Sequence, residues 1–332
     1  MNSTTYKAGK LLLIEKKHQQ YKPPGYIPEE FKRLLLPQAE ISFRQDNDCA
    51  ILTQTINAGP FTLWMHDIFT REDIVLLPWT PRHVLIINYM FEDSLRAESR
   101  QSDTFPLEER ECNLLNLHAG IHKVPMSGDK KILSVHINID PALMPSLMQK
   151  YPVLAALNTS FLSAISGPVN KGPHHINLFS DFLIQKLISC RYTGTRAHYF
   201  IQRCCTDLML TFAQQETDVD HPILFTNVLH MDTFHQLFNY LIDNAGKIYS
   251  VSELAYSFYL SPDQLSHGFR QHFSITVEDC MYMLRMMTAY NLLHKKYLSL
   301  SDVAYTSGFT SVSEMIMHLE RYYNCKIDEM RT

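Results

Sequence analysis

The chain has 332 residues, which is long for one ordinary domain and suits two. Hydrophobic residues make up 45% and charged residues 19%, which excludes a disordered or low-complexity chain and allows a sizeable core. The 30 Lys and Arg against 34 Asp and Glu give a formal net charge of -4. This balance excludes a strongly basic nucleic-acid coat protein but is compatible with a DNA-binding protein that has a local basic face.

The seven cysteines include no Cys-x-x-Cys pair, so neither a disulfide framework nor a zinc knuckle is indicated. The apolar run near the N-terminus, Leu11 to Ile14, is far too short for a signal peptide or a membrane span. We therefore expect a soluble, cytoplasmic protein with reduced thiols and no membrane contact.

Residues 51–140 carry short apolar runs separated by Pro, Gly, Asn and Asp, a texture that predicts the strands of a small β-sandwich or barrel. The runs are Ala50–Ile56, Phe61–Met65, Asp73–Leu77, His83–Phe91, Leu114–Leu117 and Lys131–Ile139. Apolar and polar residues alternate in the last run, so every second side chain there would face a core.

The pattern becomes helical from about Pro141, with candidate helices at Pro141–Tyr151, Ile176–Arg191 and Ala197–Gln215. These helices would complete the N-terminal domain or supply a dimer face. The polar, acidic segment Glu216–His221 is the best linker candidate. We predict an α+β protein with an N-terminal effector-binding or dimerisation domain at 1–215, which comprises a β-sandwich at 51–140 and helices at 141–215. A linker at 216–231 and an all-helical domain at 232–332 would follow.

Two stretches of the last hundred residues, Val251–Pro262 and Leu300–Ser311, echo each other. Each places Ser and an acidic residue before an apolar residue and Ala. The predicted helix N-caps and the acidic residues after them are Ser252, Glu253, Ser301 and Asp302. Gly308 suits a left-handed turn. The pattern predicts two helix-turn-helix units, whose second helices would enter the major groove of DNA.

The second helices of these units are predicted at Pro262–Phe273 and Ser311–Tyr323. Candidate DNA-binding residues of the first unit are Ser261, Pro262, Asp263, Gln264, Ser266, His267, Arg270 and Gln271. Those of the second unit are Thr310, Ser311, Ser313, Glu314, Met317 and Arg321. Arg and Gln can read guanine and adenine edges in bidentate fashion. Arg270, Lys295 and Arg321 are candidates for phosphate contacts.

A connecting helix is predicted at Thr276–Lys296. Its length would be roughly 31 Å, close to the roughly 34 Å of one turn of B-DNA. A helix of this length could hold two reading helices on one face of the duplex, in successive major grooves.

The C-terminal third of the chain is similar to the DNA-binding domain of the AraC/XylS family of bacterial transcription regulators. The matching residues are Leu254-Ala255, Leu260 to Ser266, Phe269-Arg270, Leu284-Arg285, Ala289, Leu292-Leu293, Leu300 to Ala304, Gly308-Phe309 and Ser313. The resemblance implies a sequence-specific regulator that binds double-stranded DNA, responds to an effector and is not an enzyme. It also implies a cupin-like N-terminal β-sandwich, and it allows a small-molecule effector, a homodimer and contact with RNA polymerase.

The sequence departs from the family pattern in both units. Ser274 stands where the family has Gly, and Gly268 replaces a large apolar residue at a cost of about 1 kcal/mol relative to Ala. From Phe234 onward, the chain has eight basic and ten acidic residues. Few phosphate contacts are therefore available, and we expect the first unit to do most of the base reading. The alternative is a relative of these regulators with weakened or lost DNA binding that acts through protein or ligand binding.

An effector pocket could be lined by aromatic and His side chains of the strand region. The candidates are Trp64, His66, Trp79, His83 and Tyr89, and plain packing is the alternative for each. His118, His122 and His136 lack the spacing of a metal-dependent cupin enzyme. We therefore predict no catalytic residues, no metal site and no cofactor.

Overall fold

The computed structural model describes residues 12–15, 26–99, 102–157, 166–170, 172–218, 231–295 and 297–331. The chain forms two compact units. The first, here called the sheet unit, comprises Met1–Ile176 and Ile184–Arg191. The second, the helical unit, comprises Asn177–Leu183 and Tyr192–Thr332.

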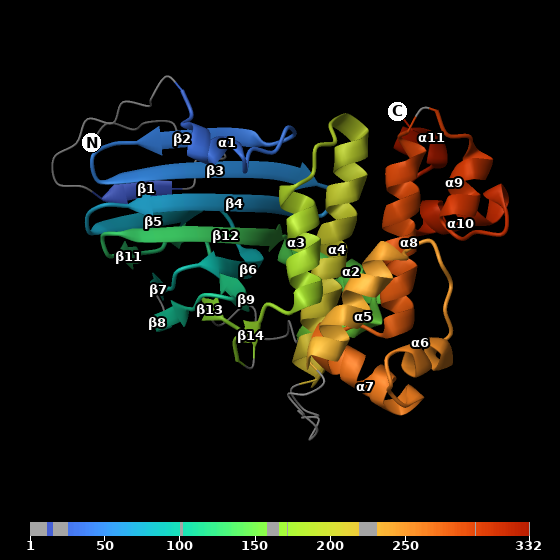
Figure 1. The fold of residues 1–332 in the computed structure, drawn as a ribbon. Coiled ribbons are helices and arrows are strands. Elements are labelled where there is room, and N and C mark those ends of the chain that lie inside the picture. The colour runs from blue at the N-terminus through green and yellow to red at the C-terminus, as the bar shows by residue number, and fades with distance from the viewer. Residues whose placement is uncertain are drawn as a thin grey trace. The chain divides into compact units, whose positions relative to one another are not determined.

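The sheet unit is built from antiparallel strands (Figure 1). The larger sheet has the order β13-β9-β6-β12-β4-β3-β2, with β14 also paired to β9, while β1, β10 and β11 pair with β5, and β7 pairs with β8. The strands are β1 Leu12–Glu15, β2 Glu40–Gln45, β3 Cys49–Ala58, β4 Phe61–Thr70, β5 Ile74–Thr80, β6 Val84–Glu92, β7 Leu95–Ser99, β8 Ser102–Leu107, β9 Glu111–Leu117, β10 Gly120–Ile121, β11 Val124–Met126, β12 Lys130–Ile139, β13 Gly167–Pro168 and β14 His174–His175. The helical turns of this unit are α1 Glu29–Lys32, η1 Pro141–Leu143, α2 Met144–Lys150 and η2 Pro152–Leu157.

One face of the larger sheet shares an apolar core with the smaller strands. The larger sheet contributes Cys49, Ile51, Ile68, Ile86, Met90, Leu115 and Ile132, and the other strands contribute Ile74, Leu76, Ala97, Leu107, Val124 and Met126. Side chains alternate between the two faces of a strand, so the core residues of β3 and of β6 are separated by an even number of positions. The predicted strand region and the α+β class are confirmed. The edge strand β2 is absent from the prediction because its residues are exposed or half-buried and form no apolar run.

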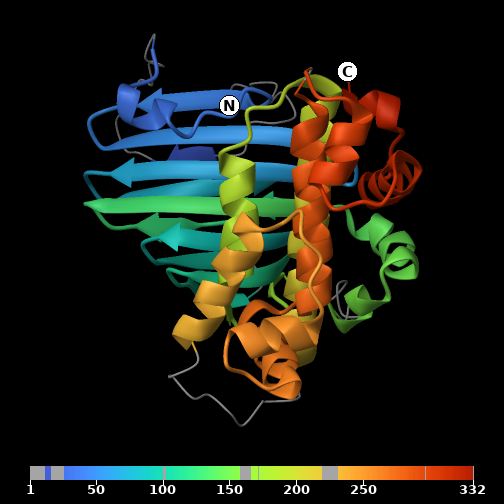
Figure 2. The same cartoon turned by 45° about the vertical axis from the view of Figure 1, so that its right-hand side comes forward.

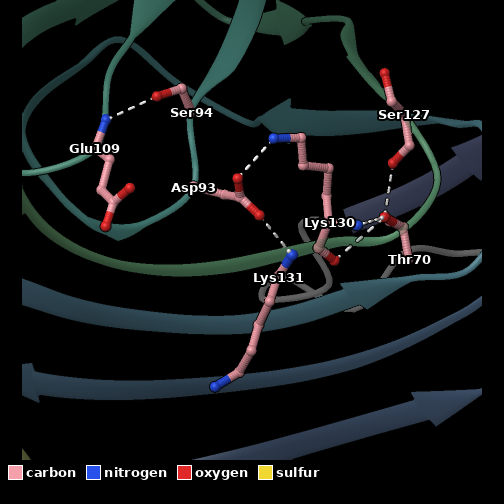
Figure 3. Close-up of polar contacts among 7 residues, drawn as sticks. All are labelled: Thr70, Asp93, Ser94, Glu109, Ser127, Lys130 and Lys131. Carbon is pink, nitrogen blue, oxygen red and sulfur yellow. Dashed lines mark hydrogen bonds and ion pairs between the residues drawn. The ribbon is translucent and has the colours of Figure 1, made fainter.

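Hydrogen bonds of side chains link the ends of neighbouring strands in the sheet unit (Figure 3). Asp93, which has a φ of 54°, accepts hydrogen bonds from Lys130 Nζ at 2.6 Å and from the backbone N–H of Lys131 at 3.0 Å. These contacts lower the pKa of the Asp93 carboxyl, the Lys130 hydrogen bond being the largest cause. Thr70 Oγ1 donates to the carbonyl of Ser127 at 2.7 Å and accepts from the N–H of Lys130 at 3.1 Å. The strand ends are thereby held by side chains as well as by the backbone ladder.

The helical unit contains the helices of the second half of the chain. They are α3 Leu178–Ile188, whose last residues belong to the sheet unit, α4 Gly194–Asp218, α5 Met231–Asp243, α6 Val251–Ser257, α7 Pro262–Phe273, α8 Val277–Leu293, α9 Leu300–Thr306, α10 Val312–Tyr323 and α11 Ile327–Arg331. The pair α6 and α7 and the pair α9 and α10 lie at opposite ends of α8 (Figure 2). Each predicted helix of this region has an observed counterpart.

Helix α4 packs with the C-terminal helices through α10 and α11. The buried Asp207 carboxylate accepts hydrogen bonds from Arg203 and, at 2.7 Å, from the hydroxyl of Tyr322 in α10. The predicted N-terminal domain at 1–215 includes Arg203 and Asp207, because helical periodicity shows an apolar stripe but not which partner buries it. Of the predicted linker 216–231, residues 219–230 lie outside the described residues.

Candidate nucleic-acid interface

The first helices of both helix-turn-helix units begin with a capping box. Ser250 Oγ accepts from the N–H of Glu253 at 3.2 Å, and Glu253 Oε2 accepts from the N–H of Ser250 at 2.7 Å. Ser299 and Asp302 repeat the arrangement in α9. The prediction that Ser252 and Ser301 are the N-caps is therefore wrong. The acidic residue lies three positions after the cap rather than one, because only there can its carboxylate reach back to the cap N–H.

The first recognition helix, α7, begins as predicted at Pro262 behind the N-cap Ser261. Ser261 Oγ accepts from the N–H of Gln264 at 3.1 Å, and Gln264 Oε1 accepts from the N–H of Ser261 at 2.8 Å. The side chains of Ser261 and Gln264 thus form an uncharged capping box. The helix is held in the domain by its buried inner face, which consists of Leu265, Phe269 and Phe273.

The outer face of α7 carries most of the predicted base-reading residues. Asp263, Ser266, His267 and Arg270 are exposed, and Gln271 is half-buried. His267 Nδ1 lies 2.9 Å from the carbonyl oxygen of Asp263 and therefore donates to it. The Nε2 atom of the neutral ring then remains as an acceptor for a base amino group.

Arg270 is engaged by an acidic side chain at the end of α4. Its Nη2 atom lies 3.3 Å from Asp218 Oδ1, and the two side chains are 44% and 29% exposed. Exposed pairs of this kind contribute about 0–1 kcal/mol. A DNA phosphate could therefore take the place of Asp218 at small cost.

The second recognition helix, α10, has a charged cap where α7 has a neutral one. Glu314 Oε2 accepts from the N–H of Thr310 at 2.8 Å and from Thr310 Oγ1 at 2.5 Å, while Ser311 Oγ accepts from the N–H of Glu314 at 3.1 Å. The hydrogen bonds from Thr310 lower the pKa of Glu314, so the carboxylate stays ionised at neutral pH. Its negative charge lies at the helix end that would otherwise attract a phosphate.

The outer face of α10 offers little to a base or a phosphate. Ser313, Met317 and Arg321 are exposed, and the thioether of Met317 is the largest apolar group among them. Glu320 accepts from Lys326 Nζ at 3.1 Å and from the N–H of Ile327 at 3.0 Å, which ties its carboxylate to the start of α11. The exposed cation of this face is Arg321.

The connecting helix α8 is shorter than predicted. It has 17 residues, or about 26 Å, instead of 21. It ends at His294, whose Nδ1 and Nε2 atoms lie 2.6 Å from the carbonyl oxygens of Tyr290 and Met330. Lys295 follows the helix, and Lys296 lies outside the described residues. The predicted extent is therefore wrong at this end, where the C-cap His294 contacts α11 instead of continuing the helix.

Two glycines bring the loop before α6 against the turn of the second unit. Gly308 has a φ of 75°, which confirms the predicted left-handed turn. A Cβ on Gly308 would lie 2.2 Å from the carbonyl oxygen of Gly246, and a Cβ on Gly246 would lie 2.2 Å from that of Thr306. Backbone meets backbone here, so only residues without a side chain fit.

The departures from the family pattern in α7 also have structural causes. A Cβ on Gly268 would lie 2.1 Å from the ring of Phe234, which is buried between α5 and α7. The missing side chain thus makes room for an aromatic ring. Ser274 adopts a φ of 54° at the C-cap of α7, where the family has Gly, and its Oγ accepts from Asn177 Nδ2 at 3.2 Å.

Two of the predicted effector-binding residues lie on the core-facing side of the larger sheet. Directly paired residues of antiparallel strands point to the same face, and Ile68 of β4 faces the core. Trp64 and His66 share its face, and β12 places His136 and Ser134 opposite them. His136 is in turn opposite Asn88 of β6. Ser134, His136 and Asn88 are not among the predicted effector-binding residues, because the pairing of strands far apart in the chain has no local signal.

The side chains of this row are uncharged. The rings of His66 and His136 are 5.0 Å apart at nearly right angles. Burial lowers the pKa of His66 to about 4, and burial followed by the neighbouring His66 lowers the pKa of His136 well below its ordinary value. Ser134 Oγ and His136 Nε2 are 3.0 Å apart. Both amide atoms of Asn88, which is 0% exposed, lack a hydrogen-bond partner among the described residues.

The other three predicted effector-binding residues lie elsewhere. Tyr89 follows Asn88 in the strand and therefore points to the opposite face, where it is fully buried. His83 stacks on His118 with ring centroids 4.7 Å apart. Trp79 pairs with Ile121 of β10. No group of three or more His, Cys, Asp or Glu among the described residues is placed to hold a metal ion.

The C-terminal part of the chain is similar to known helix-turn-helix domains. Residues 254–332 match the model of a helix-turn-helix domain family. The C-terminal domain of the response regulator YesN from Fusobacterium nucleatum subsp. nucleatum is 24% identical over 30% of this chain and 99% of that chain, with a TM-score of 0.29. The DNA-binding domain of AdpA, solved with a target DNA, is 20% identical over 29% and 86%, with a TM-score of 0.28.

Similar structures of ToxT cover more of the chain. Fatty-acid-bound ToxT from Vibrio cholerae is 12% identical over 82% of this chain and 95% of that chain, with a TM-score of 0.30. None of the curated proteins compared with the chain matches it. Within the described ranges, no helix is both long and apolar enough to cross a bilayer.

Proposed function

We propose that the chain is a sequence-specific, effector-responsive transcription regulator of the AraC/XylS type, with residues 254–332, which match a helix-turn-helix domain model, as its DNA-binding part. The observation that carries the proposal is the outer face of α7. Ser266, His267 and Arg270 are exposed there, behind the capping box of Ser261 and Gln264, whereas α10 has Met317 at the position of His267.

In this proposal α7 enters the major groove. His267 and Gln271 contact base edges, and Arg270 leaves Asp218 to bind a phosphate. Helix α10 contributes weaker contacts through Ser313 and Arg321. A homodimer and contact with RNA polymerase remain predictions from the family resemblance.

Selection of bound fragments from random-sequence duplexes by the full-length protein tests the DNA-binding part. We expect an enriched motif that loses its base preference in His267→Ala, while Met317→Ala in α10 keeps it. Two half-sites about one helical turn apart would assign base reading to α10 as well. The absence of any enriched motif, with and without cell extract as a source of effector, would instead support the alternative function through protein or ligand binding.

The effector part of the proposal rests on Asn88. A buried amide without a partner costs about 1–3 kcal/mol, which a ligand that hydrogen-bonds to it would recover. It is paired with His136 of β12 and with Asn113 of β9, and Trp64, His66 and Ser134 continue the same face on β12 and β4. None of these side chains is charged at neutral pH. The effector that fits is an uncharged molecule with hydroxyl, carbonyl or amide groups, because nothing in the row would neutralise a buried charge.

Thermal unfolding of the full-length protein with a panel of small metabolites tests this part. We expect an uncharged polar compound to raise the unfolding temperature of the wild type. Asn88→Leu should raise the unfolding temperature without any ligand, because it removes an unpaired amide of similar size, and it should abolish the ligand-induced shift. A ligand-induced shift that survives in Asn88→Leu would place the effector elsewhere.

A further inference from the structure

Four tyrosines of the helix-turn-helix region are strongly exposed, and three of them, unlike Tyr297, lie in or directly after the first helix of a unit. Tyr256 is 86% exposed, Tyr259 98% and Tyr305 87%. Tyrosine rings usually bury most of their area, so rings this exposed contribute little to the stability of the fold. Their use lies in what they contact outside the chain.

Two of these tyrosines occupy the same position in both units. Tyr256 follows Ala255 near the end of α6, and Tyr305 follows Ala304 near the end of α9, 49 positions later. The preceding alanines are buried in both cases. The two units therefore present an equivalent hydroxyl on the exposed side of their first helix.

The third tyrosine is held in a strained conformation. Tyr259 has a φ of 57°, and the residue that corresponds to it in the second unit is Gly308, with a φ of 75°. A tyrosine pays a steric penalty in the left-handed region that a glycine avoids. Strained residues of this kind concentrate at functional sites. Tyr259 lies two positions before Ser261, the N-cap of the recognition helix.

The helix-turn-helix region has few cationic side chains for phosphate contacts. DNA-binding proteins contact phosphates mainly through Lys and Arg, yet the chain from Phe234 onward has only eight basic residues and ten acidic ones. Tyrosine hydroxyls are also phosphate donors. The first helix of a helix-turn-helix unit crosses the DNA backbone, so residues exposed on α6 and α9 lie on the part of the unit that approaches phosphates.

We propose that the hydroxyls of Tyr256, Tyr259 and Tyr305 donate hydrogen bonds to backbone phosphates of the bound DNA. These contacts are uncharged and compensate in part for the small number of Lys and Arg contacts to phosphates. The inference rests on the proposed DNA binding and goes beyond it, because it assigns the backbone contacts and predicts how the affinity depends on salt. Neutral donors neutralise no phosphate, so they add affinity without releasing counterions.

Phenylalanine substitutions in the full-length protein test the proposal, because they remove only the hydroxyl. Binding is measured on the duplex recovered by selection and on a random-sequence duplex of the same length, between about 50 and 200 mM salt. We expect Tyr256→Phe, Tyr259→Phe and Tyr305→Phe each to raise Kd about two- to tenfold on both duplexes, with an unchanged salt slope. Arg270→Ala should instead make the slope shallower by about 0.9.

Two further variants separate contact from folding. Tyr26, which is 74% exposed in the sheet unit, provides the control Tyr26→Phe, and its Kd should equal that of the wild type. Tyr259→Gly should raise the unfolding temperature because it relieves the positive φ, and it should nevertheless raise Kd. Stability and affinity would then move in opposite directions, which a purely structural role cannot produce.

The outcomes distinguish the two levels of the proposal. Wild-type affinity in the triple Phe variant would overturn the tyrosine contacts and leave DNA binding intact. A loss of affinity accompanied by a shallower salt slope would also overturn them, because it would mean that cationic contacts were lost. If the wild type binds neither duplex at any salt concentration, the proposed function itself fails and the tyrosine contacts fail with it.

Discussion

The two helix-turn-helix units have the same internal frame and different outer surfaces. In the first helices, Leu254 and Ala255 correspond to Val303 and Ala304, 49 positions later, and all four are buried. In the recognition helices the offset is 50, because the second turn is one residue longer. The buried residues Leu265, Phe269 and Phe273 then correspond to Met315, Leu319 and Tyr323.

The outward positions between these buried residues differ in chemistry. With the offset of 50, Gln264, Ser266, His267 and Arg270 correspond to Glu314, Ile316, Met317 and Glu320. In these four pairs the α7 residue is neutral or basic and the α10 residue is acidic or apolar, whereas Asp263 corresponds to Ser313 and Gln271 to Arg321. Packing constrains the inner face of a recognition helix, whereas its outer face can change without affecting the fold. A shared scaffold therefore does not imply a shared ability to bind DNA.

The turn of the second unit should be the most sensitive point of the comparison. Gly308→Ala would place a Cβ 2.2 Å from the Gly246 carbonyl oxygen at a φ of 75°. We expect a loss of about 2–4 kcal/mol in the free energy of unfolding, measured in urea. Tyr259→Gly at the corresponding turn should stabilise the protein. A loss below about 1 kcal/mol for Gly308→Ala would show that the loop before α6 can move away.

Substitutions on the outer faces of the recognition helices should have the next largest effect. We expect His267→Ala to weaken binding to the selected duplex by about tenfold and to relax the preference at one base pair. Met317→Ala, its counterpart in α10, should change Kd by less than about twofold. Competition binding with single-base variants of the duplex measures both. Equal losses from the two substitutions would show that both units read bases.

Exchanging the caps should shift affinity between the units. Glu314→Gln keeps an oxygen for the Thr310 N–H and removes the charge, so we expect Kd to fall about threefold. Gln264→Glu adds the same charge to α7 and should raise Kd by a similar factor or more. Both effects should shrink at high salt, since surface charges are screened. An unchanged Kd in Glu314→Gln would place the α10 terminus away from the DNA.

The contact between Asp218 and Arg270 should give the smallest effect. Asp218→Asn releases the guanidinium in the first unit, and we expect Kd to fall about twofold, because exposed ion pairs are weak. The double variant with Arg270→Ala should show no further benefit from Asp218→Asn. A gain that persists in the double variant would mean that Asp218 acts on the DNA directly, by repulsion, rather than through Arg270.

The row of Trp64, His66, Ser134, His136 and Asn88 in the sheet unit can be predicted from the sequence only in part. Trp64 and His66 are predicted as aromatic and His side chains of the strand region, and they share a face of β4 because they are two residues apart. Asn88 and His136 belong to other strands and join them only through the sheet order β6-β12-β4. Tyr89 was included although strand alternation turns it away from Asn88, since the face that each strand turns to the core was not known.

The sequence by itself determined the features that depend on residues a few positions apart. The limits of α7, its inner residues Leu265 and Phe269 and the left-handed Gly308 all follow from helical period, capping and local backbone sterics. The tertiary structure alone decided which groups meet through space. It placed Phe234 against Gly268, gave the buried face of α4 its partners in α10 and α11, and brought Asp218 to Arg270. Such contacts join residues far apart in the chain, and no short-range pattern encodes which of the many apolar or charged partners a given side chain will reach.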